Sequence, residues 1–188
     1  MSGPYVYTTA IWPPILTAFF LLALAAYSWR RRSVPGALPF AASCVFSAVW
    51  AAGYALQYAA TDHLAKAFWL RFGLAWSLPG LTAITCFILE YAWPGRWLTR
   101  RNLALLAIMP LLFMLLLASR FHPLLIRDYV VSDDVFAQTA PGGWVFFIYA
   151  YVLGLLNIGV LVWLFVRSPQ QRWLAALLMA GQVVSRAF

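Results

Sequence analysis

Long apolar stretches alternate with short polar connections along the whole chain. An α-helix rises about 1.5 Å per residue, so roughly 20 apolar residues cross the ~30 Å hydrocarbon core of a membrane. Six stretches reach or approach this length, at about residues 11–28, 36–59, 67–91, 103–119, 144–166 and 173–188. Each is continuously apolar, whereas the strands of a membrane barrel alternate apolar and polar residues over about 10 positions. The pattern predicts an all-α polytopic membrane protein, with a bundle of about six transmembrane helices in a single domain over residues 1–188.

The composition excludes several other classes of protein. Hydrophobic residues make up 64% of the chain and charged residues 10%, whereas soluble domains are typically about 45–50% apolar and roughly 25% charged. This excludes a disordered chain, a secreted disulfide scaffold and an ordinary soluble enzyme. Cys44 and Cys86 lie inside apolar stretches and receive no assigned role. The sequence contains no nucleotide-binding, metal-binding or catalytic-triad motif, so we predict no cofactor, no metal and no catalysis in this chain.

The basic residues divide unevenly between the two sides of the predicted bundle. Eight of the 13 lie in connections on one side: Arg30, Arg31, Arg32, Arg96, Arg100, Arg101, Arg167 and Arg172. The other side carries Lys66, Arg120 and Arg127, together with four acids, Asp62, Asp128, Asp133 and Asp134. Because short basic loops stay in the cytoplasm, we predict a bacterial inner-membrane protein with its amino terminus outside. The net charge of +8 therefore does not indicate a nucleic-acid partner, which would require a clustered basic face.

Aromatic and polar residues recur at helical spacing on three predicted spans. Ser47, Trp50, Tyr54 and Gln57 share a face of the second span, and Trp69, Phe72 and Trp76 share a face of the third. Tyr149, Leu153 and Asn157 follow one face of the fifth. If these faces converge, they form a mostly aromatic outer cavity for a small molecule between spans two, three and five. The alternative is that each residue belongs to the core or to the interfacial aromatic belt. The candidate ligand-binding residues are Trp50, Tyr54, Arg71, Trp76, His122, Tyr149 and Asn157.

Three charged or titratable residues have both a functional and a structural interpretation. Arg71 is either an anchor for an anion at the outer cavity, or a structural partner of Asp62 that extends to the headgroups. His122 suits pH sensing, but it also suits a hydrogen bond that orders the loop after span four. Glu90 lies near the inner end of span three, where an ion pair with the basic inner loop is the simple interpretation.

The longest outer connection, at about residues 120–143, contains Pro141 and the pair Gly142-Gly143. Its length and mixed charge predict a small lid or an outer helix. Within the spans, Pro79-Gly80 and Pro110 are expected to kink or loosen their helices.

An ordered set of motifs resembles the amino-terminal seven-transmembrane sensor region of bacterial histidine kinases. The motifs are PGALPF, AVWAAGYALQY, FWLRFGLAWSLPG, LEYAWPGRWLTRR, RFHPLL and GGWVFFIYAY, in this order and over nearly the whole chain. The resemblance implies a sensory input domain with seven spans in its intact form, the seventh following Phe188. It further implies a two-component kinase module in the cytoplasm on the same polypeptide, and a homodimer.

The sequence leaves three function classes open. The leading hypothesis is a sensor that detects an unknown small molecule outside or within the lipid bilayer and relays the signal to a cytoplasmic transmitter. The alternatives are a transporter or permease component, and a passive membrane anchor for a cytoplasmic signalling enzyme. A transporter would require polar groups along its path, and the spans offer few of them.

Overall fold

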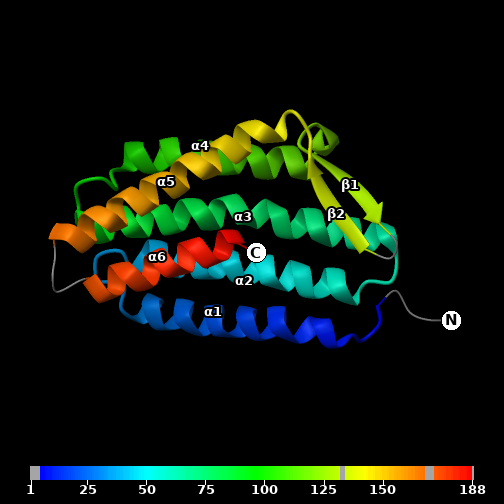
Figure 1. Cartoon of the computed structure of the whole chain (residues 1–188), viewed down its shortest axis with the longest axis horizontal. Coiled ribbons are helices and arrows are strands. Elements are labelled where there is room, and N and C mark those ends of the chain that lie inside the picture. The colour runs from blue at the N-terminus through cyan, green and yellow to red at the C-terminus, as the bar shows by residue number, and fades with distance from the viewer. Residues whose placement is uncertain (1–4, 132–133, 168–171, 188) are drawn as a thin grey trace.

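The computed structural model describes residues 5–131, 134–167 and 172–187. Its helices lie side by side in an elongated bundle, with a small two-stranded sheet at one end (Figure 1). The helices are α1 (Trp12–Arg30), α2 (Ala37–Ala59), α3 (His63–Ala92), α4 (Arg100–Ala118), α5 (Gly143–Arg167) and α6 (Arg172–Ala187), and two 3₁₀ turns, η1 (Thr9–Ile11) and η2 (His122–Leu124), precede α1 and follow α4. The predicted helical bundle is confirmed.

Five of these helices, α1 to α5, are long and apolar enough to cross a membrane by length and composition. The sixth predicted span is represented by α6, which has 16 residues. Its predicted final residue, Phe188, lies outside the described residues. The helix α3 is longer than predicted because it begins at His63. There the side chain of Asp62 accepts a hydrogen bond from the backbone N–H of Ala65 at 3.3 Å and caps the helix.

The helix α3 is in contact with α2, α4 and α5. It approaches α2 closely at two glycines: a Cβ atom on Gly53 would lie 3.0 Å from the Cα of Gly73. The small residues of the second span therefore permit close packing against α3. Pro79 and Pro110, which are expected to kink or loosen their helices, end neither helix: α3 continues past Pro79 and α4 continues past Pro110.

The two ends of the bundle differ in charge and structure (Figure 1). The α1–α2 and α3–α4 connections meet at one end, here called the basic end, which carries Arg30–Arg32, Arg96, Arg100, Arg101, Arg167 and Arg172. The opposite end, here called the hairpin end, holds the α2–α3 connection and the small sheet. Of the four acids predicted on this side, Asp133 lies outside the described residues.

The connection between α4 and α5 forms a β-hairpin, and the expected outer helix is wrong. Strand β1 (Ile126–Val131) pairs antiparallel with β2 (Asp134–Thr139), with Ile126 opposite Thr139. Both strands are rich in β-branched and aromatic residues, which favour a pleated strand over a helix. At its base, Ala140 N–H donates to the Leu125 carbonyl at 2.9 Å. A Cβ atom on Gly143 would overlap the same carbonyl, so the glycine lets α5 begin directly against the hairpin.

Candidate functional site

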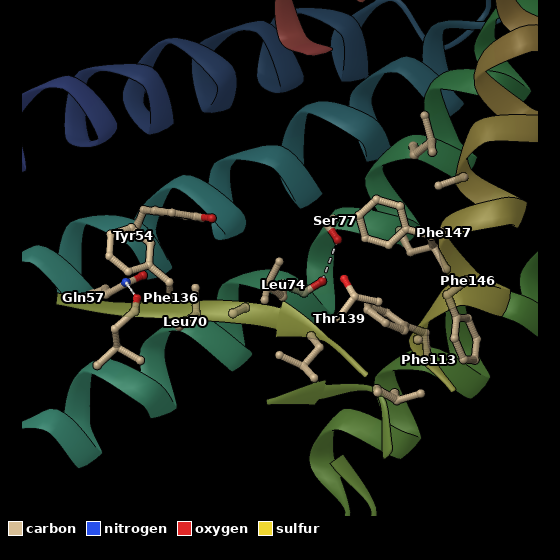
Figure 2. Close-up of a pocket in the computed structure, with 18 of the residues that line it drawn as sticks. Tyr54, Gln57, Leu70, Leu74, Ser77, Phe113, Phe136, Thr139, Phe146 and Phe147 are labelled. Carbon is tan, nitrogen blue, oxygen red and sulfur yellow. Dashed lines mark hydrogen bonds between the residues drawn. The ribbon is translucent and has the colours of Figure 1, made fainter. Parts of the chain in front are cut away.

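A cavity of about 800 Å³ lies at the hairpin end, between α2, α3 and α5 and beneath the hairpin (Figure 2). The sequence places a candidate cavity between these same three spans. The helices contribute most of the residues that line the observed cavity: Tyr54, Gln57 and Tyr58 from α2, Leu70, Leu74, Ser77, Leu78 and Leu81 from α3, Phe113 from α4, and Gly143, Phe146, Phe147, Ala150 and Tyr151 from α5. The connection between α4 and α5 contributes the others: Leu125 before the hairpin, and Ile126, Val135, Phe136, Ala137 and Thr139 within it. Tyr54 and Gln57 lie at one end of the cavity in Figure 2, and Phe113 and Phe146 lie at the other.

Helical periodicity places these side chains on the cavity walls. On α3, Leu70, Leu74 and Leu78 recur every four residues, so they form a continuous stripe along one face. The start of α5 forms the opposite wall, where Phe146 packs against Phe113 of α4 with ring centroids 5.0 Å apart. The cavity is therefore built on helices, with only its cover supplied by the hairpin.

A side-chain hydrogen bond connects α2 to the hairpin across the cavity. Gln57 Nε2 donates to the Val135 carbonyl at 3.2 Å (Figure 2). This bond fixes the orientation of the amide, since the opposite orientation would place two oxygen atoms against each other. Gln57 Oε1 is buried and has no hydrogen-bond partner within the described ranges.

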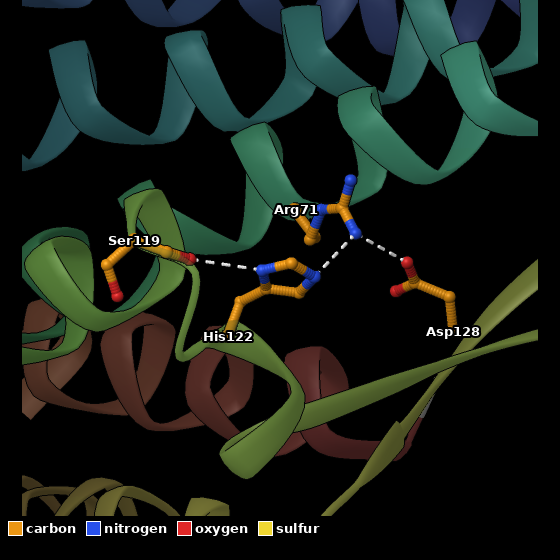
Figure 3. A network of polar contacts seen from close by, with 4 residues as sticks. All are labelled: Arg71, Ser119, His122 and Asp128. Atoms are coloured by element: carbon orange, nitrogen blue, oxygen red, sulfur yellow. Dashed lines mark hydrogen bonds and ion pairs between the residues drawn. The ribbon is translucent and has the colours of Figure 1, made fainter.

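A polar network attaches the hairpin to α3 on the same end of the molecule (Figure 3). Arg71 Nη1 donates to Asp128 Oδ2 at 2.8 Å and lies 3.0 Å from His122 Nε2. His122 Nδ1 lies 3.1 Å from the Ser119 carbonyl. Both contacts are satisfied by a neutral imidazole whose Nδ1–H donates to Ser119 and whose Nε2 accepts from Arg71. The Arg71 guanidinium thus connects α3 to η2 and to β1.

The position of Arg71 along α3 explains how its charge is accommodated. Arg71 and Glu90 are 19 residues apart, which is about 28 Å along a helix and close to the thickness of the hydrocarbon core. The two charges therefore lie near opposite edges of the apolar layer. The side chains of Arg71 and Asp128 are 25% and 23% exposed, so their ion pair is only partly shielded.

Two predicted ion pairs are corrected by the structure. Arg71 pairs with Asp128 rather than with Asp62, because Asp62 caps α3. Glu90 Oε1 accepts the backbone N–H of Gly95 at 3.0 Å. Its other oxygen is buried without a partner in the described part of the chain, so the expected ion pair with the basic loop is replaced by a turn-stabilising hydrogen bond.

Only Tyr54 among the seven candidate ligand-binding residues lines the main cavity. Trp76 stacks on Phe46 of α2 with ring centroids 5.8 Å apart and so packs between helices. Trp50 contributes to a separate cavity of about 460 Å³ between α1 and α2, which Tyr54 also borders. Arg71 and His122 belong to the network above.

The remaining two candidates lie within the bundle. The Tyr149 hydroxyl donates to the Leu106 carbonyl of α4 at 3.1 Å. Asn157 is fully buried, and its Nδ2 donates to Thr85 Oγ1 of α3 at 3.1 Å. Tyr149 thus contacts α4 and Asn157 contacts α3, and neither residue lines the cavity.

Several residues of the cavity were not singled out from the sequence. The α5 wall of Phe147, Ala150 and Tyr151 follows helical spacing, which could have indicated a second face on this span. The hairpin residues could not be assigned, because their place depends on the fold of the outer connection. Among the described residues, no group of three His, Cys, Asp or Glu side chains comes together as a metal site.

Comparison with known families now identifies the kind of molecule. A family model described as the N-terminal 7TM region of histidine kinase matches residues 13–187. The chain belongs to this family. The resemblance seen in the sequence is thereby confirmed, and the 7TM region is a membrane sensory domain of a histidine kinase. No curated protein and no solved structure is significantly similar to it.

Proposed function

We propose that this 7TM region is the sensory input domain of a bacterial two-component histidine kinase, in which the cavity at the hairpin end receives the stimulus. Residues 1–188 act as one transmembrane sensor domain, carry no catalytic activity themselves, and regulate a cytoplasmic kinase module on the same polypeptide. The functional unit is a homodimer in the inner membrane. The observation that carries the proposal is the cavity bounded by three spans and the hairpin.

The distribution of charge supports the orientation. The basic end carries the arginine-rich connections, so it faces the cytoplasm, and the hairpin end and amino terminus face outward. A membrane-impermeant maleimide should therefore label Arg127→Cys in intact cells, and should label Arg100→Cys only after the cells are opened. The reverse labelling pattern would overturn the orientation.

The geometry provides a physical route for a signal. A ligand shifts a two-state equilibrium only through different affinities for the two states. The cavity is lined by α2, α3, α5 and the hairpin, and α3 and α5 continue from there to the basic end. A change in their relative packing at the hairpin end is therefore transmitted to the cytoplasmic side.

Filling the cavity tests the proposal in the full-length kinase. Ala150 is a partly buried residue of the α5 wall, so Ala150→Phe places a ring in the cavity. We expect the autophosphorylation rate in membranes to change by about fivefold or more, the lower range of typical allosteric coupling. The matched control is Ile148→Phe, two residues away on the same helix, where the side chain is 62% exposed.

The result also separates the alternatives. Equal autophosphorylation rates for Ala150→Phe and the parent protein would favour a passive anchor and overturn the input role of the cavity. Solute uptake into sealed vesicles containing the domain, abolished by Ala150→Phe, would favour a transporter.

A further inference from the structure

We propose that the cavity takes a neutral, largely apolar small molecule that carries a hydrogen-bond donor and enters from the outer leaflet of the bilayer. This inference rests on the proposed input function, and it adds the chemical class of the ligand and its route. It follows from three features of the cavity, namely the absence of charge in its lining, an unsatisfied acceptor and an aromatic mouth.

The lining of the cavity excludes a charged ligand. None of its described lining residues is an Asp, Glu, Lys, Arg or His. Nine of the 20 lining residues are leucine or phenylalanine, and the polar ones carry only neutral hydroxyl or amide groups. A charged group would lose its hydration in such a site without meeting a counter-charge, which is very costly. The nearby charges of Arg71 and Asp128 are already paired with each other.

The polar part of the wall favours a ligand with a donor. Gln57 lines the cavity and its amide nitrogen is bound to Val135. Its Oε1 has no partner among the described residues and is covered by neighbouring atoms, so a donor in the cavity reaches it only after a small shift of the Gln57 side chain. A buried acceptor without a partner is unfavourable. Once the side chain has shifted, a hydroxyl or N–H group of a ligand would satisfy Gln57 Oε1, whereas a second acceptor would not.

The residues at the opening of the cavity indicate that the ligand enters from the lipid. Three of its lining residues are large aromatic side chains that remain about half exposed: Phe136 at 57%, Phe147 at 46% and Tyr151 at 56%. They come from β2 and the first turns of α5, at the level of the outer interface where aromatic residues concentrate. An opening with such a rim is reached by molecules dissolved in the membrane more readily than by water-soluble ones. Its volume of about 800 Å³ lies within the usual range for small-molecule sites.

The experiment uses a ten-carbon aliphatic alcohol with a photoreactive diazirine, incorporated into nanodiscs that contain the full-length protein. After illumination, labelled peptides are identified by mass spectrometry. We expect the label on the α2, β2 and α5 segments that line the cavity. Competition is measured with 1-decanol, decane, decanoate and decyltrimethylammonium at equal concentrations in the membrane. We expect decanol to compete best, decane about tenfold less well because it lacks a donor, and both ions at least about a hundredfold less well.

Two variants test the proposed contacts. Gln57→Leu should remove the advantage of decanol over decane while leaving decane competition unchanged. The control for the same chemical change is Gln138→Leu, at an exposed glutamine of β2 that does not line the cavity. Ala150→Phe should abolish labelling, and Ile148→Phe should not.

Three results would overturn the inference. Label spread over the lipid-facing side of α1 would show that the alcohol has no preferred site. Competition by decanoate equal to that by decanol would refute the requirement for neutrality. Labelling of residues 1–188 alone that disappears in the full-length protein would show that another segment of the polypeptide fills the cavity.

The two proposals fail in distinguishable ways. If Ala150→Phe alters autophosphorylation but the alcohol does not label the cavity, the input site stands and the ligand class is wrong. If the alcohol labels the cavity but Ala150→Phe leaves autophosphorylation unchanged, the binding site stands and its signalling role is wrong.

Discussion

The two ends of the bundle differ in how their helices pack. Near the basic end, Ile88, Val160 and Leu161 form a core that is at most 9% exposed, and Leu178 and Met179 of α6 pack against it. At the hairpin end, the same helices α3 and α5 form a second buried cluster, which includes Leu78 and Phe146, and they also border a cavity of about 800 Å³. Close packing transmits displacement, since a filled core has no free volume to absorb it. An end with free volume has room to accept a molecule.

The polar contacts reinforce the same contrast. The hairpin is fastened by discrete side-chain contacts, from Arg71 to Asp128 and from Gln57 to Val135. Such contacts are made or lost one at a time. The hairpin also packs Ile126 and Val135 into buried clusters at this end, so these polar contacts add to apolar packing. Because these polar contacts border a cavity of about 800 Å³, we expect the hairpin end to adjust more readily than the core near the basic end.

Two matched leucine truncations give the largest expected difference. Leu161 is 1% exposed, and Leu161→Ala should leave a void that costs about 2–5 kcal/mol in the free energy of unfolding. Leu74 already borders the cavity, so Leu74→Ala should cost clearly less, about 1–2 kcal/mol. Thermal or denaturant unfolding of the purified domain in one detergent measures both. Equal losses for the two variants would mean that the hairpin end is as tightly packed as the other and would remove the contrast.

Removing the guanidinium should loosen the hairpin without affecting the basic end. Arg71→Gln leaves Asp128 without its cation and His122 without the donor to its Nε2. The ion pair is about one quarter exposed, so we expect a loss of about 1–2 kcal/mol, between the values for exposed and for charged hydrogen-bonded pairs.

Amide hydrogen exchange locates this loss. Residues 126–131 and 134–139 should exchange about five- to thirtyfold faster in Arg71→Gln, while the amides of Val160 and Leu161 keep their protection. Arg127→Gln, which changes the exposed arginine next to Asp128, serves as the control and should leave exchange unchanged. Faster exchange at both ends would show that the network stabilises the whole bundle rather than the hairpin.

The sequence was most informative where a single physical rule dominates. Continuous apolar runs can satisfy their backbone hydrogen bonds in lipid only as helices, so the long spans follow directly from hydropathy. The unequal placement of arginines likewise distinguishes the two ends of the bundle. The helical face of Tyr54 and Gln57 also pointed toward the cavity that they line.

The sequence was least informative where the outcome depends on a connection outside the helices. The hairpin brings Asp128 to Arg71 across 57 positions of the chain, and no helical spacing contains this contact. Asp62 was the nearer partner in sequence, but its side chain is used by the helix cap. The face of Asn157 was recognised, but periodicity does not say which neighbour a face meets, and here it meets Thr85.

The smallest expected effect concerns this buried pair, which lies between the cavity and the core near the basic end. Asn157 Nδ2 donates to Thr85 Oγ1, while Asn157 Oδ1 has no partner among the described residues. Thr85 Oγ1 donates to the Leu81 carbonyl at 2.9 Å and keeps that bond without Asn157. Asn157→Leu therefore loses one interhelical hydrogen bond, worth about 0.6 kcal/mol on average in membranes, and also removes an unsatisfied acceptor.

We expect the unfolding free energy of Asn157→Leu to stay within about 1 kcal/mol of the parent, because the two changes oppose each other. Thr85→Val should be worse, since it leaves the buried Nδ2 without an acceptor, and combining it with Asn157→Leu should recover the loss. A drop of more than about 2 kcal/mol in Asn157→Leu alone would mean that Oδ1 is bound, for example by a buried water, because replacing an unpaired acceptor does not cost that much. The contact between α3 and α5 at Asn157 and Thr85 would then be hydrated. The tightly packed core would in that case begin nearer the basic end than Asn157.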